Sequence, residues 1–75
     1  MKGQGLLIMY DEVWAVDAKR VEAFFRENPG DVTVEPLPDR KLGSMTMPQT
    51  RIVIRGENAD ELYRRFYLSF MTAGG

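Results

Sequence analysis

Few side chains in this sequence have the types and spacing that catalysis needs. Histidine, which most often does general acid–base work, is absent from the 75 residues. Asp11 and Glu12 are adjacent carboxylates near a predicted strand, but successive strand side chains point to opposite faces and do not converge. Tyr10, Trp14 and Arg55 would have to line a pocket, and aromatic residues of this kind more often belong to a core. We therefore predict that the protein is not an enzyme and that Asp11 and Glu12 end their strand in solvent.

Metal and nucleotide chemistry is poorly represented as well. With no Cys and no His, the chain has neither disulfides nor a zinc site built from thiolates and imidazoles. It also lacks the D-x-[DN]-x-[DN]-G run of a calcium loop. The segment Gly3-Gln4-Gly5 precedes a predicted strand instead of joining a strand to a helix, so it does not match a phosphate-binding loop. We expect no cofactor and no metal.

Cations near two predicted strands leave nucleic-acid binding open as an alternative. Arg40 and Lys41 fall in a predicted turn, while Arg51 and Arg55 share one face of a strand. The overall balance, Lys plus Arg 10 against Asp plus Glu 11, lacks the basic excess that binding of duplex DNA favours. Residues 50–56 also lack the aromatic residues of an RNA-recognition sheet. A small nucleic-acid-associated regulator that uses these four cations is thus the alternative function.

Length and composition predict one folded domain over residues 1–75. Apolar residues make up 44% and charged residues 28%, as is ordinary for a globular protein. A chain this short buries only about 60% of its unfolded surface and commonly needs a disulfide, a metal or a partner. The apolar run at residues 6–10 is too short for a membrane span or a signal peptide. We expect a cytoplasmic protein, and a reading frame of this size suits a bacterial or mobile-element origin.

The first half of the chain predicts a strand, a helix and an edge strand. Residues 6–10 form a short apolar run that favours a strand, which can extend to Val13 and Trp14. Asp17 can cap a helix over residues 18–28, which an Asn-Pro-Gly sequence ends. Residues 31–37 alternate with period two, and Pro36 marks an edge strand because proline donates no ladder hydrogen bond.

The second half predicts a turn, a strand and a helix. Pro38 begins a predicted tight turn at residues 38–41. Residues 42–49 are compatible with an extension of a hairpin or with a loop. Residues 50–56 form the clearest strand, with Ile52 and Ile54 pointing inward. Asn58 and Glu61 have the spacing of a capping box that starts a helix over residues 59–72.

These elements predict an α+β two-layer sandwich in the order β-α-β-β-α. We expect an antiparallel-rich sheet with two helices on one face. The order resembles the ferredoxin-like fold, β-α-β-β-α-β, without its last strand. In that fold the first strand lies between the third strand and the last, so its loss would leave residues 6–10 as an exposed apolar edge. Such edges recruit another strand, and we predict edge pairing or an additional covering element.

Apolar side chains beyond the needs of a two-layer core indicate an interaction surface. On the last helix, Tyr67, Leu68 and Met71 lie outside the stripe that docks on the sheet, either as exposed single residues or as part of an interface. Leu7, Met9 and Val53 share the sheet face away from the helices, where stacked sheets or a ligand could lie. We predict a non-enzymatic protein–protein interaction or assembly module that associates with itself as a homo-oligomer (dimer) or binds another protein. This would be an accessory or regulatory protein that does not act at a membrane.

Overall fold

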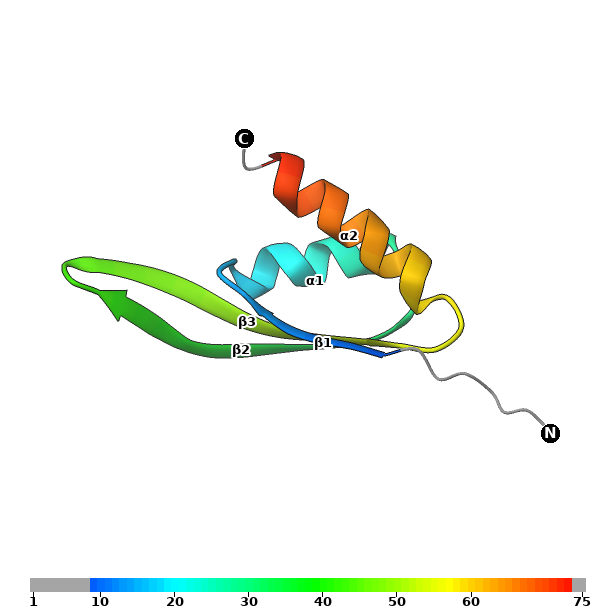
Figure 1. Ribbon diagram of the computed structural model, residues 1–75, viewed down its shortest axis with the longest axis horizontal. Helices are drawn as coiled ribbons and strands as arrows, with labels where there is room; N and C mark the ends of the chain where they lie inside the picture. The colour runs from blue at the N-terminus through cyan, green and yellow to red at the C-terminus, as the bar shows by residue number, and fades with distance from the viewer. Residues whose placement is uncertain (1–8, 74–75) are drawn as a thin grey trace.

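The chain folds into one antiparallel sheet with two helices on one of its faces (Figure 1). The computed structural model describes residues 9–73. The elements follow one another as β1 (Met9–Trp14), α1 (Ala18–Glu27), β2 (Asp31–Leu42), β3 (Met45–Arg55) and α2 (Ala59–Ala73). The predicted α+β sandwich and its β-α-β-β-α order are confirmed.

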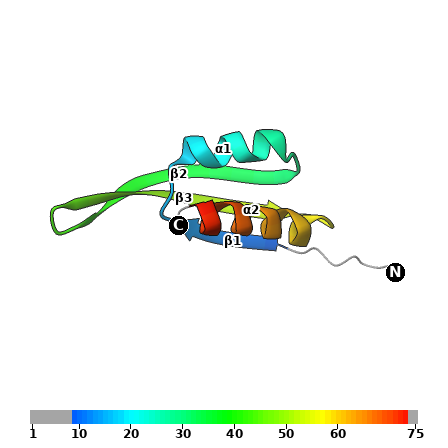
Figure 2. The ribbon, with the colours of Figure 1, turned by 90° about the horizontal axis from the view of Figure 1, so that it is seen from above.

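β3 is the central strand of the sheet, whose order is β1-β3-β2. It pairs with β1 from Met9 opposite Arg55 to Trp14 opposite Thr50, and with β2 from Asp31 opposite Arg55 onward. Seen from above, α1 lies over β2 and α2 lies over β1 (Figure 2). Each helix therefore shields one side of the same sheet face, and β1 and β2 form the two edges of the sheet.

The core lies between the sheet and the two helices. Ile52 and Ile54 of the central strand are 2% and 0% exposed, which confirms that they point inward. The residues of the buried cluster are Val21, Phe25, Ile52, Ile54, Ala59, Leu62 and Phe66. Thr50 is buried beside them, and its hydroxyl donates a hydrogen bond of 2.7 Å to the carbonyl oxygen of Val16. That bond satisfies a polar group that would otherwise be costly to bury.

The two helices begin differently. The Asp17 side chain accepts a hydrogen bond of 2.9 Å from the backbone nitrogen of Lys19, so the predicted cap of α1 is confirmed. At the start of α2, the predicted capping box is wrong: among the interactions of the described residues, the Asn58 side chain makes no hydrogen bond. Glu61 instead forms an ion pair of 2.7 Å with Arg65, one turn along the helix. Arg65, four residues along the helix, therefore binds the Glu61 carboxylate that a capping box would need.

The first strand includes the extension to Val13 and Trp14 that the sequence allowed. Residues 6–8 of the predicted strand lie outside the described residues, and β1 runs through Asp11 and Glu12 to Trp14. The prediction that these two carboxylates end the strand is therefore wrong. Both have partners in the fold: Arg51 donates two hydrogen bonds to Asp11, and Glu12 accepts one from Tyr63. Charged side chains that are satisfied in this way do not interrupt a strand.

The middle of the chain forms one long hairpin. Residues 42–49 belong to it as strand and turn, and Gly43 supplies the positive φ of 63° that the turn needs. The predicted turn at residues 38–41 is wrong, because the register shifts between Leu37 and Arg40 and β2 continues to Leu42. Two residues of β2 there oppose only Pro48 of β3, which is the arrangement of a β-bulge. β2 is an edge strand, as Pro36 predicted.

The end of this hairpin extends beyond the helices as an arm, here defined as residues 37–49. The pairing of β1 with β3 stops at Thr50, so the arm has two strands where the rest of the sheet has three. Figure 1 shows it projecting away from both helices, and the molecule measures 53 × 21 × 18 Å. The arm gives the protein its elongated shape and sets it apart from the body around the core.

Candidate interaction surface along the first strand and the second helix

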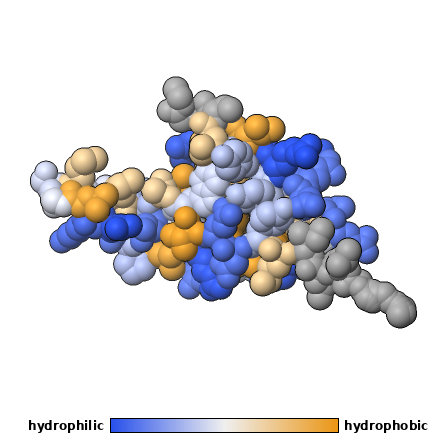
Figure 3. Space-filling view, viewed as in Figure 1, coloured by the Kyte–Doolittle hydropathy of each residue, from blue (hydrophilic) through white to orange (hydrophobic). Residues whose placement is uncertain are grey.

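The outer edge of β1 has no neighbouring strand among the described residues, because β1 pairs only with β3. Apolar side chains are exposed on both sides of this edge. On the sheet face without helices, Met9 and Val13 are 61% and 53% exposed. On the opposite side of the edge, Met71 of α2 is 53% exposed. The edge surface, as we call it, consists of Met9, Val13, Tyr67, Leu68 and Met71. In Figure 3, apolar patches alternate with hydrophilic areas over the face that carries β1 and α2.

Four of the six residues predicted to form an interface lie on this edge surface. Tyr67, Leu68 and Met71 occupy the outer side of α2, and Met9 occupies β1. Val53 is placed differently: it is on the predicted sheet face but only 6% exposed, so it offers almost no surface to a partner. Leu7 lies outside the described residues. Val13 was not among the predicted interface residues, although the sequence allowed the strand to extend to it.

Val53 is covered by its neighbours on the same face. Arg51 and Arg55 stand two residues to either side of it along β3, and both are held sideways toward the flanking strands. Arg51 donates hydrogen bonds of 2.9 and 2.7 Å to Asp11 on β1, and Arg55 donates one of 2.9 Å to Asp31 on β2. Long arginine side chains cover apolar surface with their methylene groups in this way. The centre of the uncovered sheet face is therefore a layer of ion pairs, which makes stacking of two sheets through Val53 unsuitable.

The ion pairs also change the electrostatics of this face. The hydrogen bonds from Arg51 hold the pKa of Asp11 below its usual range, and Asp11 in turn raises the pKa of the Arg51 guanidinium. Arg51 has a second carboxylate partner in Glu35, at 3.4 Å. Arg55 adds a hydrogen bond of 2.8 Å to the hydroxyl of Thr33. Both cations are thus committed to groups of the same chain.

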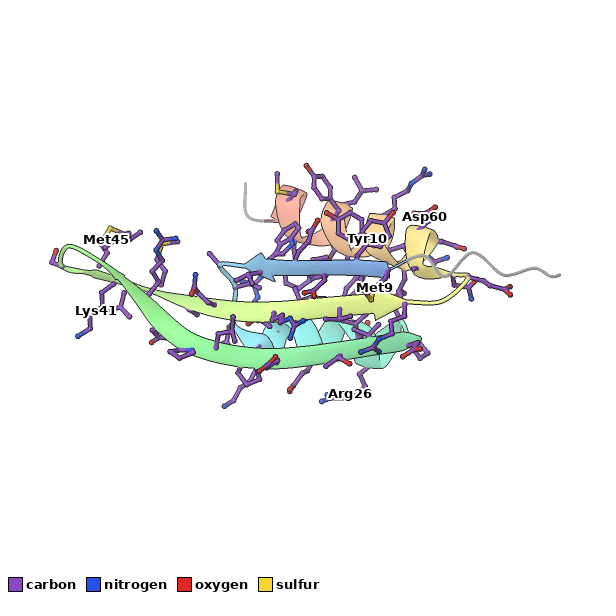
Figure 4. All side chains as sticks on the ribbon, turned by 60° about the horizontal axis from the view of Figure 1, so that its bottom comes forward. Met9, Tyr10, Arg26, Lys41, Met45 and Asp60 are labelled. Carbon is purple, nitrogen blue, oxygen red and sulfur yellow. The ribbon has the colours of Figure 1, made fainter. Side chains whose placement is uncertain are left out.

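The four cations of the predicted nucleic-acid strip are not brought together. Arg51 and Arg55 lie in the body of the sheet with their carboxylate partners, whereas Arg40 and Lys41 lie on the arm. Successive strand residues point to opposite faces, so Arg40 and Lys41 diverge. Figure 4 shows Lys41 on the side of the arm opposite Met45. The arrangement is two separate groups of cations and not a continuous basic strip.

Aromatic side chains join β1 to α2 beneath the edge surface. Tyr10 stacks on Tyr63 with ring centroids 4.2 Å apart and planes 4° from parallel. Trp14 makes an edge-to-face contact with Phe66 at 4.8 Å and with Tyr67 at 5.8 Å. Pairs of this geometry contribute roughly 0.5–1.5 kcal/mol each beyond the area that they bury. β1 is therefore attached firmly to α2, and its outer edge is a preformed part of the surface.

Hydrogen bonds fix the orientation of these rings. Glu12 accepts bonds of 2.9 Å from both the Tyr63 hydroxyl and the indole nitrogen of Trp14. The Tyr10 hydroxyl donates to Asp60 at the start of α2, and Figure 4 shows the two residues side by side. Burial, together with the bond to Glu12, raises the pKa of Tyr63 to about 12, and the bond to Asp60 raises the pKa of Tyr10. Both hydroxyls therefore remain donors at neutral pH. The sequence did not predict this network, because its members lie about fifty residues apart in the chain and only the fold brings them together.

A shallow groove runs along α2 above the edge of β1. Its lining residues are Tyr10, Asp60, Glu61, Tyr63, Arg64, Arg65, Tyr67 and Leu68. Its two carboxylates already have partners, since Asp60 accepts from Tyr10 and Glu61 pairs with Arg65. The described residues hold no group of three or more side chains that could ligate a metal ion. The groove thus combines aromatic and aliphatic surface with the cationic side chains of Arg64 and Arg65, which suits contact with another polypeptide.

A second exposed apolar patch lies on the arm. Leu42 and Met45 face each other across the hairpin and are 46% and 64% exposed. Met47, the next residue of β3 on that face, is half-buried. This patch differs from the edge surface because it lies on a two-stranded part of the sheet that no helix covers (Figure 1).

Comparison of the chain with models of protein families, with curated proteins and with solved structures gives no match. Among the described residues, no helix combines the length and the apolar character needed to cross a membrane. The edge surface and its geometry are consequently the basis for the function proposed below.

Proposed function

We propose that the protein is a non-enzymatic assembly module that associates with itself through the edge surface. The observation that carries this proposal is the combination of an unpaired strand edge with exposed apolar side chains on both of its flanks. Unpaired edges are templates for pairing with another chain, and exposed apolar patches commonly mark interaction sites. In β1 both features occur in six residues and continue onto α2.

The charged residues of β1 do not protect this edge. Soluble proteins often guard an edge strand with charged side chains that another strand could not accommodate. Here Asp11 is neutralised by Arg51, and Glu12 turns toward the helix layer, where Tyr63 and Trp14 bind it. The outer edge of β1 is left with apolar neighbours and with carboxylates that already have partners, which favours association.

The size of the chain supports the same function. A domain of 75 residues without cysteine has no covalent staple, and burying exposed Met9, Val13 and Met71 against a second molecule would add the apolar area that it lacks. The strand order β1-β3-β2 also equals that of a ferredoxin-like sheet without the strand that would pair with β1. We propose that a strand of another molecule takes that place.

Sedimentation equilibrium of the full chain over a micromolar range tests the proposal. We expect a mass above the 8.6 kDa of the single chain, with a concentration-dependent transition. Met71→Lys should weaken association, and Leu42→Lys is the matched control because it places the same charge at a similarly exposed apolar site on the arm. A wild-type protein that stays monomeric, or a control that weakens association as much as Met71→Lys, would contradict the proposal.

Nucleic-acid binding is the less supported function, because Arg51 and Arg55 are paired with carboxylates of the same chain. Anisotropy titrations with mixed oligonucleotides distinguish the two functions. We expect no salt-sensitive binding. Binding that declines with added salt and is lost in the Arg40→Ala, Lys41→Ala variant would instead favour a nucleic-acid role for the arm.

A further inference from the structure

We infer that two copies of the chain join their sheets by antiparallel pairing of β1 with β1 of the second copy, about a two-fold axis at Asp11. The combined sheet would then run β2-β3-β1 and continue β1-β3-β2 in the partner. This inference rests on the proposed self-association and adds its geometry: the occupant of the open edge and the register in which it binds.

The apolar residues of β1 are placed symmetrically about Asp11. Met9 and Val13 stand two residues before and two residues after it, and all three side chains alternate with the half-buried residues that face the helices. In an antiparallel pair centred on Asp11, Met9 of each copy lies directly opposite Val13 of the other. Side chains placed opposite each other in this way have Cβ atoms about 4.5–5.5 Å apart and contact directly. This register therefore forms two symmetric contacts between Met9 of one copy and Val13 of the other, which bury both residues.

The charges at the axis are compatible with this register. Two bare carboxylates would repel, but each Asp11 is bound by two hydrogen bonds from its own Arg51. The low pKa of Asp11 keeps the carboxylate ionised and paired. Each Asp11 therefore meets its counterpart at the axis with a guanidinium of its own chain already bound to it.

Other two-fold registers leave worse contacts. Directly opposite residues of an antiparallel pair point to the same face, so the axis must pass through a residue and not between two residues. An axis at Tyr10 would place Met9 against Asp11 of the second copy. An axis at Glu12 would place Val13 against Asp11 and bring together two Glu12 carboxylates, neither of which has an ion pair among the described residues. Axes nearer the strand ends would pair fewer of the six residues of β1.

The helix layer extends the same interface. α2 lies over β1 (Figure 2), so a two-fold axis at the edge of β1 places α2 of the two copies on the same side of the joined sheet. The exposed Tyr67 and Met71 are then available to cover each other across the axis. The β1 pairing sets the register, and the helices supply further apolar area.

Isotope-mixed NMR tests the register on the unaltered chain. In a dimer of labelled and unlabelled copies, we expect an intermolecular NOE between the Met9 ε-methyl and the Val13 methyl groups. Within one chain these residues are four apart along the strand, about 13 Å, which is too far for a direct methyl contact. A dimer without this intermolecular NOE would overturn the register while leaving self-association standing. A monomer would overturn both.

Cysteine pairing provides an independent check, because the natural chain contains no cysteine. We expect a disulfide-linked dimer when Met9→Cys and Val13→Cys chains are mixed and oxidised. Each variant alone should give several-fold less, since neither residue faces its own copy in this register. A linked dimer that forms equally well from Val13→Cys alone would contradict an axis at Asp11. Urea-unfolded samples oxidised in parallel measure the nonspecific level.

Discussion

The two edges of the sheet are built differently. The β2 edge carries Pro36 and Pro38, and a bulge follows directly after Leu37. Proline donates no ladder hydrogen bond and a bulge bends the strand, so both features hinder the addition of another strand. The β1 edge has neither, and Asp11 and Glu12 within it are satisfied by their own chain. The comparison indicates that one edge is closed to pairing and the other is open.

The largest expected effect comes from making the open edge charged. We expect Met9→Lys with Val13→Lys to weaken dimerisation by roughly a hundredfold or more. Burial of such a side chain contributes roughly 1.5–3 kcal/mol, and each 1.4 kcal/mol corresponds to a factor of ten. Sedimentation equilibrium measures the change. The matched control is Leu42→Lys with Met45→Lys on the arm, and equal weakening by that control would remove the distinction between the two regions.

A second change should open the closed edge. In Pro36→Val with Pro38→Val, β2 regains two backbone donors and residues that favour strands. We expect species larger than the wild-type assembly in sedimentation velocity, because both edges would then accept a strand. Unchanged sedimentation in a variant that keeps its folded circular dichroism spectrum would show that the prolines do not protect this edge.

A smaller effect is expected at Thr50 on the central strand, which pairs with both edge strands. Thr50 of β3 stands opposite Trp14 on one side and Pro36 on the other, and its buried hydroxyl bonds to the carbonyl oxygen of Val16. Thr50→Val leaves that carbonyl without its partner, which should lower the free energy of unfolding by about 1–3 kcal/mol. Urea denaturation measures it. Thr50 lies on the central strand and not at the dimer edge. Weaker dimerisation without loss of stability would therefore contradict a purely structural role for its hydrogen bond.

The smallest expected effect concerns pH. The folded-state pKa of Asp11 is lowered, chiefly by its hydrogen bonds with Arg51. Its contribution to stability is therefore complete above the unfolded value of about 3.9 and is lost as the pH falls below that value. We expect wild type to be more stable than Asp11→Asn near pH 7, and this difference in stability to shrink as the pH falls below about 3.9. Urea midpoints at a series of pH values provide the comparison, and a constant gap would mean that ionisation of Asp11 contributes nothing.

Local patterns in the sequence predicted most of the architecture. The Asp17 cap and the Asn-Pro-Gly sequence identified α1, and the inward-pointing Ile52 and Ile54 identified the central strand and its buried face. Pro36 marked an edge strand. The exposed side of α2 was also predictable, since Tyr67 and Met71 fall outside the stripe that docks on the sheet.

Errors arose where a partner distant in sequence decided the outcome. Asp11 and Glu12 were expected to end a strand, but Arg51 and Tyr63, some forty to fifty residues away, satisfy them. Residues 38–41 were expected to turn, but pairing with β3 extends β2 through a bulge to Leu42. Val53 was expected on an accessible face, yet it is buried between two arginines that are held to the flanking strands. None of these partners can be read from a local window.

The sequence by itself determined the element types, their order and the absence of disulfides, because periodicity, proline and composition act within a few residues. The fold analogy also placed the first strand at an open edge, but only the tertiary structure decided how the charged residues within that edge are satisfied. That outcome depends on pairing across the sheet, which places Arg51 beside Asp11, and on the docking of α2, which turns Glu12 toward Tyr63. Cross-strand pairing and helix docking join residues far apart in the chain, and they convert an apparently interrupted strand into an open edge with apolar flanks.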